Sequence, residues 1–238
     1  MPHWLSCVTD SRWVRRHSGP MSPCAMGAAL GRIARKLGRS ANDLAVSKVA
    51  RERNPFHVLV ACLISLRTKD EVTDVSAPRL LARASTPRAM AGLSEREIER
   101  LIFPAGFYHT KARRLRALGR TLDEDHGGRV PDTLEGLLAL NGVGRKTANL
   151  VVTLGFGKPG ICVDTHVHRI SNRLGFVRTN APDHTERVLR AHLPARWWIP
   201  INDLLVTWGR TVCTPLSPRC STCLVRADCR QVGVERSR

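Results

Sequence analysis

Four cysteines near the C-terminus limit the possible folds of this chain more than any other feature. Cys213, Cys220, Cys223 and Cys229 have the spacing C-x6-C-x2-C-x5-C. Thiolates are soft ligands, so four of them in one short segment indicate an iron–sulfur cluster or zinc. Zinc sites usually contain two C-x2-4-C pairs or a mixture of Cys and His. Here a single C-x2-C pair has one cysteine on either side, which favours a cubane-type cluster over zinc.

The charge of the chain indicates its kind of partner. Its 238 residues carry a formal net charge of +18 at pH 7, and such a field attracts polyanions, with DNA or RNA expected and an anionic membrane surface as the alternative. No stretch approaches the 18 apolar residues that a membrane-spanning helix requires. Cys62 and Cys162 lie in apolar runs and are interpreted as buried thiols in a reducing compartment. We therefore expect a cytoplasmic protein.

Residues 1–26 differ from the rest of the chain. They contain three prolines and lack helical periodicity, and no apolar core follows a basic start, which excludes a secretory signal. An arginine-rich, acid-poor segment partly resembles a transit peptide. We expect residues 1–26 to be a disordered extension outside the fold.

The remaining chain follows helical periodicity. Asn54-Pro55 predicts a helix start, and apolar residues follow over 56–64 at i, i+3, i+4, i+7 and i+8. Further helices are predicted over 94–102 after a capping box, over 109–125 and over 132–140, where Asp132 opens the helix. The only β-branched run outside a helical frame, 161–163, is too short to found a sheet. The predicted fold class is all-α.

A glycine turn between two predicted helices forms the second informative motif, with the sequence LNGVGRKTA over residues 140–148. Glycine tolerates positive φ and lets the backbone approach a ligand closely. The first N–H groups of the following helix can then bind an anion such as a nucleic-acid phosphate. An ordinary corner between two helices is the alternative interpretation.

Two residues near this turn are candidates for catalysis. Lys146 fits either a phosphate contact or a nucleophile, and burial beside a helix N-terminus would lower its pKa enough for attack. Asp164 is placed to cap a helix, and a carboxylate held there also suits the stabilisation of positive charge on a sugar. His166 and His168 are interpreted as packing or backbone-contact residues rather than metal ligands.

Taken in order, the glycine hairpin, the motif VDTH with Asp164 placed 18 residues after Lys146, and the cysteine loop resemble the endonuclease III family of helix–hairpin–helix DNA glycosylases. The resemblance covers about residues 28–230, including the segments 63–70 and 106–112. It implies a six-helix barrel over 48–158 that contains the helix–hairpin–helix. It also implies a second α-helical domain, 27–47 with 159–238, that carries a [4Fe–4S] cluster.

The resemblance also implies roles for individual residues. Lys146 matches the nucleophile that forms a Schiff base, Asp164 the catalytic aspartate, and the four cysteines the cluster ligands. The expected partner is double-stranded DNA with damaged pyrimidines or abasic sites, bound by a monomer in the cytoplasm, at the nucleoid in a bacterium. The expected DNA contacts are Gly142, Val143, Gly144, Arg145, Arg67, Phe107, Lys111, His166 and Arg219.

Three positions depart from the family pattern. Arg67 replaces a glutamine that fills the space left by the flipped base, Phe107 replaces an aliphatic wedge, and Asn141 replaces a proline. Two alternatives remain besides the bifunctional glycosylase and lyase. One is a monofunctional mismatch-specific glycosylase, which the presence of Lys146 disfavours. The other is a non-catalytic iron–sulfur protein that binds DNA.

Overall fold

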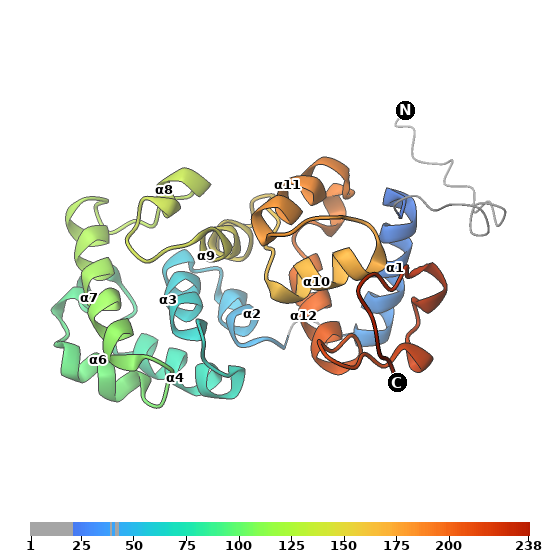
Figure 1. The fold of residues 1–238 in the computed structure, drawn as a ribbon. Coiled ribbons are helices and arrows are strands. Elements are labelled where there is room, and N and C mark those ends of the chain that lie inside the picture. The colour runs from blue at the N-terminus through green and yellow to red at the C-terminus, as the bar shows by residue number, and fades with distance from the viewer. Residues whose placement is uncertain (1–20, 39, 41–42) are drawn as a thin grey trace. The chain divides into compact units, whose positions relative to one another are not determined.

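The computed structural model describes residues 21–238 except 39, 41 and 42, and in this part of the chain the regular secondary structure is helical, without a β-strand (Figure 1). The predicted all-α class is confirmed. The chain divides into two compact units. One is Asn42–Cys162, and the other holds the described residues of Met1–Ala41 together with Val163–Arg238.

The unit Asn42–Cys162 is built around one central helix. Its α3 (Pro55–Ser65) packs against the helices before and after it in the chain, and most of its side chains are fully buried. The other α-helices of this unit are α2 (Ala45–Val49), α4 (Asp70–Arg83), α5 (Pro87–Gly92), α6 (Glu95–Ile102), α7 (Tyr108–Glu124), α8 (Leu134–Leu138) and α9 (Arg145–Leu150). A 3-10 turn, Ala50–Glu52, precedes α3, and a π-helical turn, Val151–Gly155, continues α9.

Local capping explains where several helices begin. The Asn54 side chain accepts hydrogen bonds from the N–H groups of Phe56 and His57 at 3.0 and 3.3 Å, with Pro55 as the first residue of α3. Ser94 and Glu97 form the predicted reciprocal capping box of α6. These contacts satisfy backbone donors that a helix leaves unpaired at its start. The sequence signals at both positions are confirmed.

The prediction for α8 is wrong at its start. Thr133, not Asp132, is the cap, because the Thr133 hydroxyl accepts a hydrogen bond from Gly136 N–H at 3.1 Å. The Asp132 carboxylate instead forms an ion pair with Lys158. The helix therefore starts one residue later than expected, and α8 covers Leu134–Leu138 rather than 132–140.

The second unit combines an N-terminal helix with the C-terminal segment of the chain. Its α12 (Ile201–Thr211) packs against α1 (Pro23–Leu37) and α10 (Thr165–Leu174), with α11 (Pro182–His192) on α10. Three 3-10 turns complete it: Ala195–Trp197, Cys220–Thr222 and Arg226–Asp228. Residues 213–238 therefore contain only short turns and irregular backbone.

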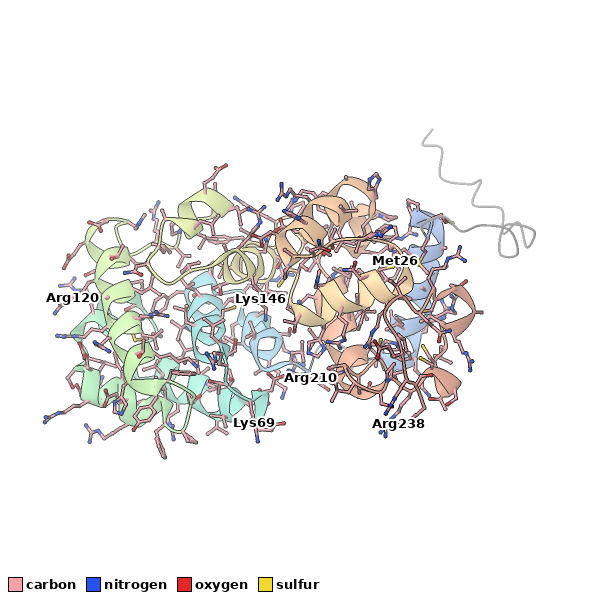
Figure 2. All side chains as sticks on the ribbon, viewed as in Figure 1. Met26, Lys69, Arg120, Lys146, Arg210 and Arg238 are labelled. Atoms are coloured by element: carbon pink, nitrogen blue, oxygen red, sulfur yellow. The ribbon has the colours of Figure 1, made fainter. Side chains whose placement is uncertain are left out.

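The boundary expected at residue 26 needs correction. The Ser22 hydroxyl accepts a hydrogen bond from Ala25 N–H at 3.2 Å, and α1 begins at Pro23. Met21 N–H donates to Gly175 at 2.8 Å, and the Met26 side chain is fully buried in this unit (Figure 2). Residues 21–26 thus belong to the fold, and the expectation for residues 1–20 lies outside the described residues. No helix among the described residues is both long and apolar enough to cross a membrane.

Candidate active site

The glycine turn has the geometry that its sequence predicts. Gly142 has a φ of 81°, in the left-handed region that favours glycine, and the extended Gly144 precedes α9 without a side-chain cap. The Val143 side chain is buried between the two glycines, and Val143 N–H donates to Leu140 at 3.1 Å. The turn is thus anchored by an apolar side chain, while the start of α9 keeps N–H groups that no capping side chain occupies.

Lys146 is the second residue of α9, and its side chain is exposed (Figure 2). The burial that the sequence left open for this side chain is therefore not observed. Its carbonyl accepts a weak hydrogen bond from the thiol of Cys162 at 3.8 Å. Cys62 is also buried, and desolvation raises the pKa of its thiol to about 12, although the positive charge of Lys146 acts in the opposite direction. Both cysteines lie among core residues, as predicted.

Asp164 belongs to the other unit and caps α10. Its Oδ1 accepts hydrogen bonds from the N–H groups of His166 and Val167 at 2.8 and 2.9 Å. The residue is half-buried, and the two backbone N–H groups fix the orientation of its carboxylate. Asp164 therefore serves as the N-cap of α10, and the same two hydrogen bonds hold its carboxylate in a fixed orientation.

All four C-terminal cysteines line one cavity. Its empty volume is about 430 Å³, which includes space open to solvent, and apolar side chains such as Ile170, Leu174 and Trp208 complete its wall. Each of the four cysteines is half-buried. Desolvation raises the pKa of Cys223, and it raises the pKa of Cys229 to about 11. The thiols thus share one cavity, whose lining combines apolar side chains with three arginines.

The cavity fits a cluster better than a single ion. Within the described residues, no three His, Cys, Asp or Glu side chains are grouped so that they hold a metal ion. Four cysteines around one cavity nevertheless form a complete set of soft ligands for a group larger than one ion. The donor set therefore fits an iron–sulfur cluster, whose inorganic core separates the four sulfur ligands.

Arg173, which the sequence interpretation missed, supports this cavity. It is buried, and its guanidinium donates to Cys213 Sγ at 3.5 Å and to the carbonyl of Thr214 at 2.7 Å. Its own carbonyl accepts from Cys229 Sγ at 3.4 Å. A buried arginine in contact with two of the four cysteines suits a negatively charged cluster. Nothing in the sequence around Arg173, which follows Ile170 by three residues on α10, distinguishes it from the many other arginines of the chain.

Arg67 and Phe107 come together in the unit Asn42–Cys162. Arg67 lies between α3 and α4, Phe107 directly precedes α7, and the Arg67 guanidinium carbon is 4.6 Å from the centroid of the Phe107 ring. Both side chains are exposed, with Phe107 at 57%. Both residues also have positive φ values, 55° and 59°. Two positions that the resemblance linked to DNA thus form one exposed pair.

The prediction that Lys111 contacts DNA is wrong. The side chain is 7% exposed, and its ammonium donates to the carbonyls of Ile64 and Leu66 and to the Thr68 hydroxyl, at 2.5, 2.7 and 2.7 Å. These contacts use all three donors of the ammonium. Desolvation lowers the pKa of Lys111 to about 8. The residue therefore supports the loop that carries Arg67.

The remaining predicted contacts lie at the ends of short elements. Arg145 is half-buried as the first residue of α9. His166 is half-buried in the first turn of α10, where its Nδ1 lies 3.2 Å from the Arg169 guanidinium. Arg219 is exposed, and its N–H donates to Val212 at 2.9 Å just before the turn Cys220–Thr222. Each of these three positions remains a prediction.

A basic cleft along α7 was also missed. Its empty volume is about 860 Å³, including space open to solvent, and its basic side chains are Arg113 and Arg114. Gly142 lies beside it, because a Cβ there would be 3.5 Å from Arg114 Cδ. The full lining is Thr110, Arg113, Arg114, Ala117, Leu118, Thr121 and Asn141. The lining residues of α7 recur at intervals of three and four residues, which places them on one face of the helix. This spacing is the sequence signal that would have identified the cleft.

The fold and the site define a class. A family model described as "HhH-GPD superfamily base excision DNA repair protein" matches residues 60–195. Endonuclease III of Thermotoga maritima is 46% identical over 179 residues, which cover 75% of this chain and 84% of that protein. The chain belongs to the endonuclease III family.

Two further comparisons agree with this assignment. Endonuclease III homolog 2, chloroplastic, of Arabidopsis thaliana is 42% identical over 183 residues, and the chain spans about half of that relative, 47% of its length. A solved structure of a trapped Endonuclease III–DNA covalent intermediate matches with a TM-score of 0.78 and 32% identity. That match covers 89% of this chain and 97% of the solved chain.

Proposed function

We propose that this protein is a bifunctional DNA glycosylase of base excision repair. It removes oxidised pyrimidines from duplex DNA and then cleaves the abasic site on its 3′ side by β-elimination. The observation that carries this proposal is the lysine at the start of α9: Lys146 follows a glycine hairpin with an uncapped helix start, in a chain of the endonuclease III family. A monofunctional glycosylase has no need of an amine at this position.

The hairpin and the exposed Lys146 side chain suit a reaction on an extruded nucleotide. A base inside a duplex hides its glycosidic carbon, so the nucleotide has to leave the stack. The start of α9, which has no side-chain cap, is suited to bind a backbone phosphate close to Lys146. The exposure of Lys146 lets the amine reach the sugar from this side.

Base removal then needs two groups. The Lys146 amine attacks C1′ after giving up a proton, a C–N bond to the lysine forms, and the glycosidic bond breaks as the base leaves with its electron pair and takes up a proton. Asp164 stabilises the positive charge that develops on the sugar, and its two backbone hydrogen bonds keep the carboxylate in one orientation.

Strand cleavage follows from the same lysine. The sugar ring opens as the C1′–lysine bond becomes a Schiff base, which makes the C2′ proton acidic. Loss of that proton forms a C2′–C3′ double bond, and the 3′ phosphate leaves with the electrons of the C3′–O bond. Water finally hydrolyses the Schiff base and frees Lys146.

We propose that Cys213, Cys220, Cys223 and Cys229 hold a [4Fe–4S] cluster. The cluster would supply a structural centre for residues 213–238, which contain only short turns. Arg173 would balance the negative charge of the bound thiolates, since it already lies beside Cys213. Arg219, exposed between two of the cysteines, would then be held where it can contact a phosphate.

The proposed partner is double-stranded DNA with damaged pyrimidines or abasic sites, bound by one copy of the chain. The formal net charge of +18 supports a polyanionic partner. The proposed compartment is the cytoplasm, at the nucleoid in a bacterium.

Borohydride trapping on a duplex with a single thymine glycol tests the function. Reduction of the Schiff base should give a covalent protein–DNA adduct with the wild type and with Lys36→Ala, whose lysine is exposed at the end of α1. Lys146→Ala should give no adduct. An adduct of undiminished yield from Lys146→Ala would refute the assignment of the nucleophile. Base release without any adduct from the wild type would instead establish the monofunctional alternative.

A further inference from the structure

We propose that Lys111 is the positioning residue that holds Arg67 and Phe107 together as one preassembled pair, without itself touching DNA. The proposal rests on the proposed function, because it gives the pair a task in base extrusion. It also replaces the direct DNA contact that the sequence predicted for Lys111.

The backbone of the pair needs support from its surroundings. Arg67 and Phe107 both adopt left-handed conformations, which residues other than glycine rarely occupy. Such conformations persist only where neighbouring structure imposes them, and they concentrate at functional sites. The stack of the Arg67 guanidinium on the Phe107 ring is exposed, where cation–π attraction is weak. The stack alone therefore does not explain how two separate loops are held together.

Lys111 holds the first loop on both sides of Arg67. Its ammonium donates to the Leu66 carbonyl before Arg67 and to the Thr68 hydroxyl after it, both at 2.7 Å. A third donor reaches the Ile64 carbonyl at the end of α3. One buried side chain thus fixes the backbone that flanks Arg67, and it satisfies carbonyl groups that the end of α3 leaves unpaired.

The Thr68 hydroxyl extends this support to the second loop. It accepts a hydrogen bond from Gly106 N–H at 3.1 Å, directly before Phe107 in the chain. A Cβ at position 106 would lie 2.5 Å from the Arg67 carbonyl oxygen, so only glycine permits this approach. The Lys111 side chain is therefore linked to the second loop through the Thr68 hydroxyl.

This arrangement explains why an arginine and a phenylalanine work together here. An apolar ring can insert between neighbouring base pairs, and a planar guanidinium can fill the space of an extruded base with its donors facing the remaining base. Because the two side chains are already stacked, little conformational freedom remains to be lost when they enter DNA. Loss of Lys111 would leave the two side chains present and release their loops.

A matched pair of variants at Thr68 tests the proposal. Thr68→Val removes the hydroxyl while keeping the shape, and Thr68→Ser keeps the hydroxyl; Lys111→Met is the more severe change. The first measurement is the single-turnover release of thymine glycol from a duplex. The second is borohydride trapping on a single-stranded abasic site, which has no opposite base and needs no insertion. Fluorescence of 2-aminopurine beside the lesion reports unstacking directly.

We expect Thr68→Val and Lys111→Met to slow base release roughly 10- to 100-fold, with a reduced 2-aminopurine signal. Thr68→Ser should stay close to the wild type, and all variants should trap the single-stranded abasic site at the wild-type rate. Equal base release by Thr68→Val and Thr68→Ser would overturn the proposal. So would an equal loss of both activities in Lys111→Met and Thr68→Val, since that indicates a merely structural role. A wild type that traps no substrate would instead refute the proposed function.

Discussion

At the scale of single residues, Lys111 is the position where burial and charge conflict. Its ammonium donates to two carbonyls and a hydroxyl rather than to a carboxylate, and desolvation lowers its pKa from 10.5 to about 8. Burial of this charge therefore costs free energy of folding whenever the native amine is protonated. The hydrogen bonds to the segment 64–68 offset some of that cost.

This conflict predicts how stability depends on pH. Between pH 8 and 10.5 the unfolded chain keeps the Lys111 proton while the native protein loses it, so the free energy of unfolding should rise with pH in that window. Relative to Lys111→Met, the wild type should gain up to about 3 kcal/mol, since one pKa unit corresponds to about 1.4 kcal/mol. Urea unfolding at pH 7.5, 9 and 10 measures this difference, with Lys36→Met as an exposed control. A difference that stays constant would contradict the pKa.

The sequence predicted which chemical groups the site contains, but it did not predict whether each of them is buried or exposed. The turn at Gly142 and the cap at Asp164 follow from local backbone preferences, and the structure has both. The burial of Lys111 depends on α3, more than 40 residues earlier in the chain. The exposure of Lys146 likewise depends on packing around α9. A lysine in a sequence motif therefore does not reveal whether it faces solvent.

At the scale of elements, α7 joins two of the proposed DNA contacts. Phe107 directly precedes its first turn, and the cleft with Arg113 and Arg114 runs along one face toward Gly142. The face from residue 110 to residue 121 is about 16 Å long at 1.5 Å per residue. Such a length spans several phosphates of one strand, and no acidic side chain lines the cleft.

The cleft predicts a change in salt dependence. We expect Arg113→Ala with Arg114→Ala to reduce the slope of log affinity against log salt by about 2, since each phosphate contact contributes about 0.9. Arg120→Ala provides a control on the same helix, because Arg120 is exposed and does not line the cleft (Figure 2). Affinity for undamaged duplex between 50 and 200 mM salt is the measurement. A double variant with the slope of Arg120→Ala would exclude the cleft from the DNA-binding surface.

Element boundaries were predictable where their causes are local. Asn54 and the pair Ser94 and Glu97 cap their helices through neighbours within three residues. At the start of α8 the sequence offers two neighbouring capping residues, and Thr133 caps the helix while the Asp132 carboxylate forms an ion pair with Lys158. The start of α1 was missed because Pro23 was attributed to an extension, although proline suits the first residue of a helix.

At the scale of the whole molecule, the second unit brings together two distant segments of the chain. Its α1 packs against α12, so the core of this unit needs residues from both ends of the chain. Helical periodicity predicted the class of the fold, and only the family resemblance predicted this pairing of segments. The reason is that apolar faces specify burial but do not specify a partner.

The four cysteines around one cavity predict that loss of a single thiol affects the C-terminal part of this unit. Cys220→Ser should abolish the brown colour and broad visible absorption of a cluster, and it should loosen residues 213–238, which lack longer helices. Cys62→Ala should keep the full colour, because Cys62 lies in the core of the other unit. Far-UV circular dichroism of Cys220→Ser should still show the helices of Asn42–Cys162, since their core contains none of the four cysteines. Colour at full intensity in Cys220→Ser would refute its assignment as a ligand, and loss of colour in Cys62→Ala would place the metal elsewhere.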